Sequence, residues 1–207
     1  PLAARVQAAA RGLGLRPAPE LARFVQLGLD AVDIKAVRRF WQAPTVAQTP
    51  GLKAVDLFQA VSNGRVRALW IMGTNPVDSL PQADGAAEAL RRCPFIVVSD
   101  VVTDTDTMPF AHVALPSAAW GEKDGTVTNS ERRISRQRGF LALPGDARPD
   151  WWQLAEVARR LGFGTAFDYP NAAAIFREHA ALSAFENAGT RDFDIGALAT
   201  LDDAAFE

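Results

Sequence analysis

Residues that bind transition metals are scarce in this sequence of 207 residues, which contains one cysteine, Cys93, and two histidines, His112 and His179. A single cysteine excludes a disulfide bond within the chain, and it excludes the cysteine-rich zinc and iron–sulfur spacings. We predict that these three residues are packed or partly exposed structural residues rather than metal ligands. Transition-metal chemistry would therefore need ligands from outside this chain.

Long apolar runs and a strong net charge are also missing. The runs ALWIMG (68–73) and FIVV (95–98) are far shorter than the roughly 20 residues that span a bilayer, so we predict no membrane segment. The formal net charge of −2 argues against nucleic-acid binding. No basic and then apolar signal segment begins the chain, which favours a cytoplasmic location. Because the first residue is Pro1 rather than methionine, we expect a processed chain or a piece of a longer one.

Apolar patterns predict alternating helices and strands. One continuous apolar run ends at Gly73 and another ends at Asp100, which is typical of strands in a parallel sheet, and residues 112–116 predict a third short strand. Helices are expected after Gly51 and over residues 83–92. The order of these elements predicts the α/β class with a mostly parallel sheet. We divide the chain into a helical lead-in at 1–50, an α/β domain at 51–190 and a tail at 191–207.

The motif GTNP at residues 73–76 follows the first predicted strand. Ligands bind at the carboxyl ends of strands in open α/β sheets, where backbone N–H groups converge. Gly73 permits close approach to the backbone, Thr74 lies beside it, and the amide of Asn75 both donates and accepts hydrogen bonds. A plain β-turn explains these four letters equally well.

Ser99 and Asp100 end the second predicted strand, and the run TDTDT follows at residues 103–107. A carboxylate at Asp100 can accept two hydrogen bonds from a sugar diol or from the N1 and N2 edge of guanine, and hydroxyls such as that of Thr105 can hold phosphate oxygens. The alternative interpretation is an acidic surface turn.

A dense polar stretch, WGEKDGTVTNSERRISRQR, occupies residues 120–138. Gly121 and Gly125 bracket a tight turn that presents Lys123, and four arginines follow. This stretch is typical of a solvated basic face on an irregular hairpin, although a phosphate site or an RNA-binding surface would use the same residues.

Two later helices are predicted from their first residues. Asp150 stands three residues before Gln153, the spacing of a capping box, so the plainest interpretation of Asp150 is a helix N-cap. Gly162 is expected to end this helix. Asn171 is expected to cap a second helix that carries His179.

Several ordered motifs carry a resemblance to a known family. They are LWIMGTNPVDSLP (69–81), VVSD (97–100) with the residues that run on to 138, RPDWWQLAEVARRLGF (148–163) and EHAALSAFENAGTRDFDI (178–195). From about Arg38 onward the chain resembles the molybdopterin oxidoreductase family, and within it the catalytic subunits of assimilatory nitrate reductases. The resemblance implies a three-layer Rossmann-like domain that binds one guanine dinucleotide of a Mo-bis(molybdopterin guanine dinucleotide) cofactor. Residues 1–36 do not match the pattern.

By motif position, the resemblance implies that the cofactor contacts the candidate residues Gly73, Thr74, Asn75, Ser99, Asp100, Thr105, Lys123 and Asp150. The Asp100 carboxylate would accept hydrogen bonds from the guanine or the ribose, and Lys123 would pair its positive charge with the cofactor. The resemblance further implies a fragment that has no catalytic residue of its own, with the tail leading to a missing carboxyl-terminal domain. The complete enzyme to which such a fragment belongs, the parent enzyme, would carry an iron–sulfur cluster and reduce nitrate. It would take electrons from ferredoxin, flavodoxin or an NADH-linked reductase. A formate dehydrogenase, a periplasmic nitrate reductase and a free-standing nucleotide-binding module are the alternatives.

Overall fold

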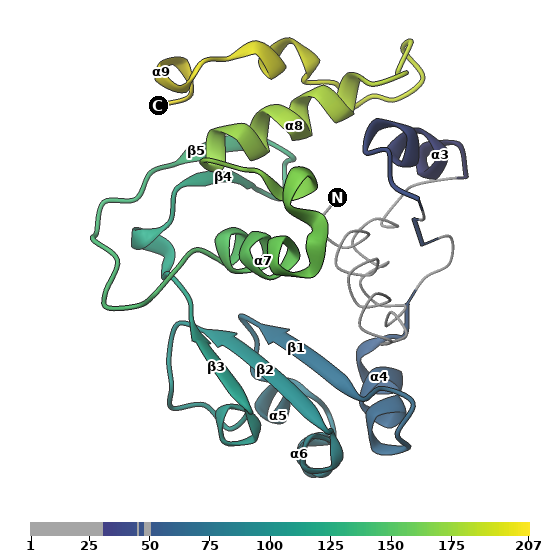
Figure 1. The fold of residues 1–207 in the computed structure, drawn as a ribbon, viewed down its shortest axis with the longest axis vertical. Coiled ribbons are helices and arrows are strands. Elements are labelled where there is room, and N and C mark those ends of the chain that lie inside the picture. Colours follow the sequence, from purple (N-terminus) through teal and green to yellow (C-terminus); the bar gives the residue numbers. More distant parts are fainter. Residues whose placement is uncertain (1–30, 45, 48–50) are drawn as a thin grey trace.

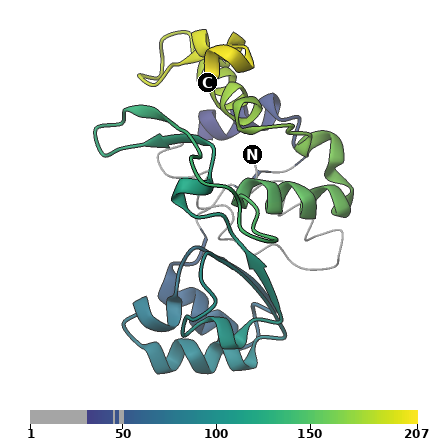
Figure 2. The ribbon, with the colours of Figure 1, turned by 90° about the vertical axis from the view of Figure 1, so that its left-hand side faces the viewer.

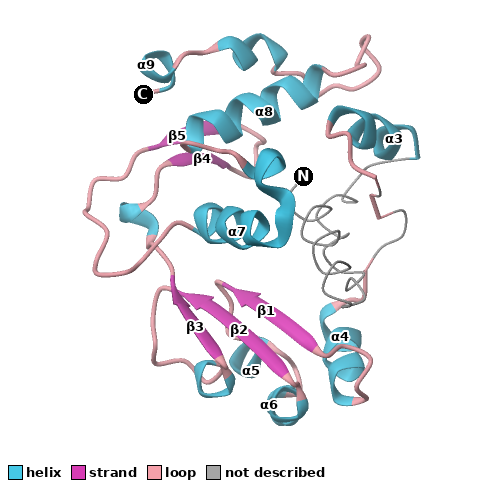
Figure 3. Cartoon of the chain, in the orientation of Figure 1, coloured by secondary structure: helices cyan, strands magenta, loops and turns pink. Residues whose placement is uncertain are grey.

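Helices, a three-stranded parallel sheet and a two-stranded antiparallel hairpin make up the computed structural model, which describes residues 31–44, 46–47 and 51–207 (Figures 1 and 3). The predicted lead-in at 1–50 lies largely outside the described residues. The strands are β1 (Ala68–Met72), β2 (Phe95–Asp100), β3 (Val113–Pro116), β4 (Gly125–Thr128) and β5 (Ile134–Gln137). The α-helices are α3 (Ala31–Phe40), α4 (Ala54–Ser62), α5 (Pro76–Ser79), α6 (Ala83–Arg92), α7 (Asp150–Ala158), α8 (Ala172–Ala184) and α9 (Asp203–Phe206). Short helical turns are η2 (Met108–Phe110), η3 (Trp120–Glu122), η4 (Arg159–Phe163), η5 (Gly164–Phe167) and η6 (Gly196–Thr200).

The main sheet has the order β1-β2-β3 with all three strands parallel. Met72 pairs with Ser99, and Asp100 pairs with Pro116, so the three strands end at one edge. The prediction of an α/β fold with a parallel sheet is confirmed. The residues that follow β1 and β2, which the sequence singled out, therefore lie at the same carboxyl edge.

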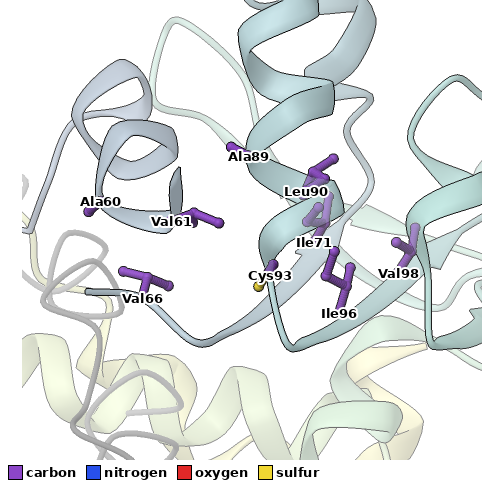
Figure 4. Close-up of a cluster of buried hydrophobic side chains, with 9 residues drawn as sticks. All are labelled: Ala60, Val61, Val66, Ile71, Ala89, Leu90, Cys93, Ile96 and Val98. Atoms are coloured by element: carbon purple, nitrogen blue, oxygen red, sulfur yellow. The ribbon is translucent and has the colours of Figure 1, made fainter. Parts of the chain in front are cut away.

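A hydrophobic cluster fixes the position of this sheet (Figure 4). Helices α4 and α6 contribute the residues of this cluster that pack on β1 and β2, and α6 spans the predicted residues 83–92. At the centre of the cluster, Leu90 is 1% exposed and Ile96 is 0% exposed. The buried members are Ala60, Val61, Val66, Ile71, Ala89, Leu90, Cys93, Ile96 and Val98. This packing makes the sheet a rigid base for the loops at its carboxyl edge.

Cys93 belongs to the same cluster and is 3% exposed. Burial raises the pKa of its thiol above the ordinary value, so the reactive thiolate is disfavoured as well as enclosed. We expect a water-soluble disulfide reagent to label Cys93 at least about tenfold more slowly in the native chain than in denaturant. Labelling at equal rates in the two conditions would show that the cluster around α6 is open.

Helix α7 lies beyond the carboxyl ends of the strands, between the sheet and the β4–β5 hairpin (Figure 1). Its Gln153 accepts a hydrogen bond from Ser99, whose side chain lies on the face of β2 opposite the hydrophobic cluster. Gly162, with φ of 88°, interrupts the helical backbone after α7 as predicted. The side chain of Asn171 accepts a hydrogen bond from the N–H of Ala174 at 2.9 Å, and this confirms the predicted cap of α8.

The segment at 191–207 folds back on the chain through η6 and α9, which pack on α8 far from the main sheet (Figures 1 and 2). Arg177 of α8 pairs with Asp203 at 2.7 Å, and this hydrogen-bonded guanidinium holds the pKa of the Asp203 carboxyl below its ordinary value. The sequence predicted only a tail here. It contains no long apolar stretch, so its attachment depends on contacts with distant residues.

Arg136 of β5 makes several of the contacts that attach α9 to the hairpin. Its side chain is 13% exposed, its guanidinium lies 4.3 Å from the ring centre of Phe206, and its Nε donates to the Phe206 carbonyl at 2.9 Å. A second nitrogen pairs with Glu207 at 3.0 Å. These contacts bring the hairpin and the end of the chain together across 70 residues.

Replacing Arg136 with methionine removes these hydrogen bonds and the cation–π contact. We expect α9 to detach, with a loss of about 1–2 kcal/mol in local stability, because a methionine keeps only the apolar part of the contact. Amide hydrogen exchange should then be faster at residues 203–207. Arg133→Met on the exposed turn is the matched control, and equal protection in both variants would contradict this role for Arg136.

Candidate functional site

Asp100 is the last residue of β2 and presents a half-buried carboxylate at the carboxyl edge. Its Oδ1 accepts a hydrogen bond from the N–H of Val101 at 2.7 Å, which fixes the orientation of the carboxylate. Its backbone carbonyl accepts from the N–H of Ser117 at 2.9 Å. No lysine or arginine of the described residues forms an ion pair with Asp100, so its second oxygen is left for an external donor.

Gly73 follows β1 at the same edge and donates its N–H to the carbonyl of Ser99 at 2.9 Å. Its φ of 59° lies in the left-handed region that favours glycine. No atom lies within 4 Å of the position that a Cβ would take, so the backbone faces open space there. The next residue, Thr74, is exposed. A ligand could therefore approach the backbone of Gly73 closely.

Asn75 connects the end of β1 to the loop that follows β2. Its Oδ1 accepts from the N–H of Thr107 at 3.1 Å and from the Thr107 hydroxyl at 2.6 Å, and its Nδ2 donates to Asp106 at 3.2 Å. Thr105 in the same loop accepts from the N–H of Met108 at 3.2 Å. Thr107 is fully buried, although the sequence did not single it out from the neighbouring threonines. These contacts shape the loop, and direct ligand contacts of Asn75 and Thr105 stay predictions.

Ser99 is fully buried rather than accessible at the edge. Its hydroxyl accepts a hydrogen bond from the indole N–H of Trp70 at 2.8 Å and donates to Oε1 of Gln153 at 2.7 Å. Alternation along β2 explains this position, because Ser99 faces away from the cluster that contains Val98. The hydroxyl is enclosed by protein, so a role for Ser99 in ligand binding would act through its neighbours.

Lys123 and Asp150 form an ion pair, with Nζ and Oδ2 2.7 Å apart. Their side chains are 31% and 38% exposed, so the pair contributes at most about 1 kcal/mol to stability and remains accessible to a ligand. The interpretation of Asp150 as an N-cap is wrong: Pro149 holds that position, and Asp150 is the first residue of α7 without a capping hydrogen bond. The capping-box interpretation of Gln153 fails for the same reason.

A chain of contacts links these residues. The N–H of Gly73 donates to the carbonyl of Ser99, and the Ser99 hydroxyl donates to Gln153. Asp150 precedes Gln153 by one helical turn and forms an ion pair with Lys123. We use the term carboxyl-edge site for Gly73, Asn75, Asp100, Lys123 and Asp150. Gly73, Asn75 and Asp100 lie where β1 and β2 end. The hydrogen bond between Ser99 and Gln153 connects this edge to α7, whose first residue, Asp150, pairs with Lys123.

The charges of the carboxyl-edge site favour particular ligand groups. Asp100 and the exposed loop residues Asp104 and Asp106 supply hydrogen-bond acceptors, which suit the N–H groups of a base or the hydroxyls of a ribose. Lys123 supplies a cation, which suits a phosphate or carboxylate. Such a site can hold a polar ligand that carries donors at one end and negative charge at the other.

The arginines after Lys123 belong mostly to a different part of the molecule. Arg136 contacts Phe206 and Glu207, and Arg138 donates to the Glu207 carbonyl. These two arginines therefore bind the end of the chain rather than forming a solvated basic face. Arg132 and Arg133 are exposed at the turn between β4 and β5, which form a regular rather than an irregular hairpin.

The comparisons with known proteins identify the class of this protein. The family model described as molybdopterin oxidoreductase matches residues 3–160, and the chain belongs to this family. The expectation that residues 1–36 do not match the family pattern is therefore wrong. In the described residues, no helix is long and apolar enough to cross a membrane.

Nitrate reductases are among its relatives. The chain is 58% identical to the nitrate reductase of Klebsiella oxytoca over 175 residues, which cover 84% of the chain and 20% of that protein. It is 45% identical to the nitrate reductase of Shewanella frigidimarina over 183 residues, which cover 87% of the chain and 19% of that protein. The F420-dependent formate dehydrogenase subunit alpha of Methanocaldococcus jannaschii is 41% identical over 56% of the chain and 17% of that protein. The chain thus spans about a fifth of the length of its two nitrate reductase relatives.

One solved structure shares the fold. Acetylene hydratase from Pelobacter acetylenicus matches 72% of this chain and 21% of its own chain, with a TM-score of 0.53 and 18% sequence identity. At this identity the similarity concerns the fold alone. It supports the α/β architecture on which the carboxyl-edge site is built.

Proposed function

We propose that this chain is part of a molybdenum-dependent nitrate reductase and that its carboxyl-edge site holds the guanosine and phosphate end of one molybdopterin guanine dinucleotide. The observation that supports the proposal is that Asn75 and Asp100 follow or end parallel strands that finish at one edge of the sheet. The Ser99–Gln153 hydrogen bond connects that edge to α7, which carries Asp150 of the Lys123–Asp150 pair. The similarity to the Klebsiella oxytoca nitrate reductase supports nitrate as the substrate of the parent enzyme.

The residues present fit such a ligand. The oriented carboxylate of Asp100 suits the N–H donors of guanine or the hydroxyls of ribose. The open space beside Gly73 gives a ligand access to the backbone, and Lys123 offers positive charge to a phosphate. Asn75 holds the neighbouring loop in place and Asp150 holds Lys123. We include Thr74 and Thr105 as further contacts, and Ser99 as a residue that supports Asp100 from inside.

The chemical properties of these residues suit them to cofactor binding rather than to the redox reaction of the parent enzyme. Molybdenum held between two such dinucleotides would supply the two-electron chemistry that converts nitrate to nitrite. This chain binds and orients one dinucleotide by hydrogen bonds and charge, and alone it catalyses no turnover. The iron–sulfur cluster, the nitrate site and the contact with ferredoxin, flavodoxin or an NADH-linked reductase would belong to the remaining domains, in a cytoplasmic enzyme.

An exposed apolar surface supports the proposal that further domains cover this chain. Trp120 and Phe140 are 65% and 75% exposed, and Leu141 and Leu143 in the same loop are 57% and 39% exposed. The loop is held in place by hydrogen bonds from the N–H groups of Phe140 and Leu141 to the Gly121 carbonyl. Large apolar side chains that gather on a fixed loop are typical of surfaces that another part of a protein covers.

The reaction is tested with the enzyme that contains this chain. Purified enzyme should reduce nitrate with a chemical electron donor and should leave formate unoxidised. The formate dehydrogenase relative makes formate oxidation the second candidate, and turnover of formate but not nitrate would establish that activity instead. A free-standing nucleotide-binding module would show neither activity and would contain no molybdenum.

A further inference from the structure

One buried amide, that of Gln153, joins three segments at the carboxyl edge. Gln153 is 5% exposed and lies on α7. Its Oε1 accepts from the Ser99 hydroxyl at 2.7 Å, and its Nε2 lies 3.0 Å from the Pro116 carbonyl and 3.2 Å from the Arg148 carbonyl. A weaker contact of 3.3 Å reaches the Ser117 hydroxyl. The side chain thus ties together the ends of β2 and β3 and the residues just before α7.

Each of the three segments that Gln153 joins lies next to a residue of the carboxyl-edge site. Ser99 precedes Asp100 in the chain, and Pro116 pairs with Asp100 across the sheet. Arg148 stands two residues before Asp150, and Gln153 itself stands one helical turn after Asp150. The two halves of the site, Asp100 on the sheet and the Lys123–Asp150 pair at the start of α7, are therefore joined by this amide.

The hydrogen bonds around Gln153 require an amide side chain in one orientation. The Trp70 indole only donates, so it makes the Ser99 oxygen an acceptor and directs the Ser99 proton to Gln153. Oε1 must then face Ser99, and Nε2 must face the two backbone carbonyls. A carboxylate at position 153 would lack the donors, and an apolar side chain would leave buried groups without partners. Trp70, Ser99 and Gln153 together fix one arrangement of the edge.

We propose that Gln153 is a positioning residue, which sets the distance between Asp100 and the Lys123–Asp150 pair and so determines the affinity for the guanine nucleotide end of the cofactor. The inference rests on the proposed function and deepens it. Because Gln153 touches the backbone on both sides of the site but is itself buried, it acts through Asp100 and Asp150 rather than by contact with the ligand.

The test is titration of the full chain with guanosine diphosphate by calorimetry, at a temperature where circular dichroism shows every variant to be folded. Gln153→Met, which keeps the volume and loses the hydrogen bonds, should raise the Kd about tenfold, as substitutions that release the support of ligand-binding residues do. Gln59→Met on the exposed face of α4 is the matched control and should leave the Kd unchanged. In an Asp100→Ala background, Gln153→Met should have little further effect.

The outcomes separate this inference from the proposed function. A lower melting temperature with an unchanged Kd would show that Gln153 only stabilises the fold, and would overturn the inference while leaving the nucleotide site in place. Absence of binding by the wild-type chain would overturn the nucleotide site itself, and the role of Gln153 with it. If Gln153→Met does not fold, Ser99→Ala answers the same question, because an unchanged Kd in that variant overturns the inference.

Discussion

Replacing Asp100 with alanine should remove most of the molybdenum from the enzyme that contains this chain, together with its nitrate-reducing activity. The carboxylate is held by the Val101 N–H and leaves its other oxygen for a ligand donor. Without it, buried N–H donors of a bound guanine would lose their acceptor, at a cost of about 1–3 kcal/mol. That loss corresponds to about a 5- to 150-fold weaker retention of the cofactor.

The measurement is molybdenum per polypeptide by metal analysis, beside the nitrate reductase rate per molybdenum. Glu131→Ala at the exposed turn between β4 and β5 removes a carboxylate away from the edge and should leave both values unchanged. Asp100→Asn should fall between the wild type and Asp100→Ala, since the amide keeps one acceptor oxygen. Full molybdenum content in Asp100→Ala would exclude Asp100 as a cofactor ligand.

Replacing Ile96 with alanine should lower the free energy of unfolding by about 3–4 kcal/mol, the largest effect on stability that we expect from one substitution. Ile96 is 0% exposed on the central strand β2 and lies beside Ile71 of β1 and Leu90 of α6 (Figure 4). The substitution removes apolar contacts and leaves a cavity that the surrounding helices fill only partly. Denaturant titration of the full chain, followed by circular dichroism, measures the change.

Val55→Ala on α4 is the comparison for Ile96→Ala, because Val55 is 54% exposed and alanine is a good helix former. It should change the free energy of unfolding by less than about 0.5 kcal/mol. Equal effects of the two substitutions would mean that the cluster between the sheet and its helices is not the core that supports the carboxyl edge.

The parallel sheet and its helices were predictable because their signals are local. The apolar runs before Gly73 and Asp100 specify buried strands, and the helical composition of residues 83–92 predicts α6 with both of its ends. The carboxyl edge followed from strand direction alone, since parallel strands end on the same side. The sequence therefore indicated where the candidate residues would gather without any knowledge of their contacts.

The partners of individual side chains were not predictable, because they depend on residues far apart in the chain. Asp150 has the spacing of an N-cap, but Lys123, 27 residues earlier, binds its carboxylate and Pro149 holds the cap position. Gln153 reaches Ser99 across 54 residues, and nothing near either residue marks them as a buried pair. Arg136 contacts Phe206 in a segment whose sequence contains no long apolar run. In each case the contact depends on tertiary packing that the local sequence does not specify.

Amide NMR of the full chain during titration with guanosine diphosphate tests most directly whether the carboxyl edge of the sheet holds the guanine nucleotide end of the cofactor. We expect the largest chemical-shift changes at Gly73, at Asp100 and the two residues after it, and at Lys123 and Asp150. Saturation of these changes at a single Kd, with α8 and α9 unaffected, would support the claim. Shift changes confined to the β4–β5 hairpin or to the 191–207 segment, or no changes, would contradict it.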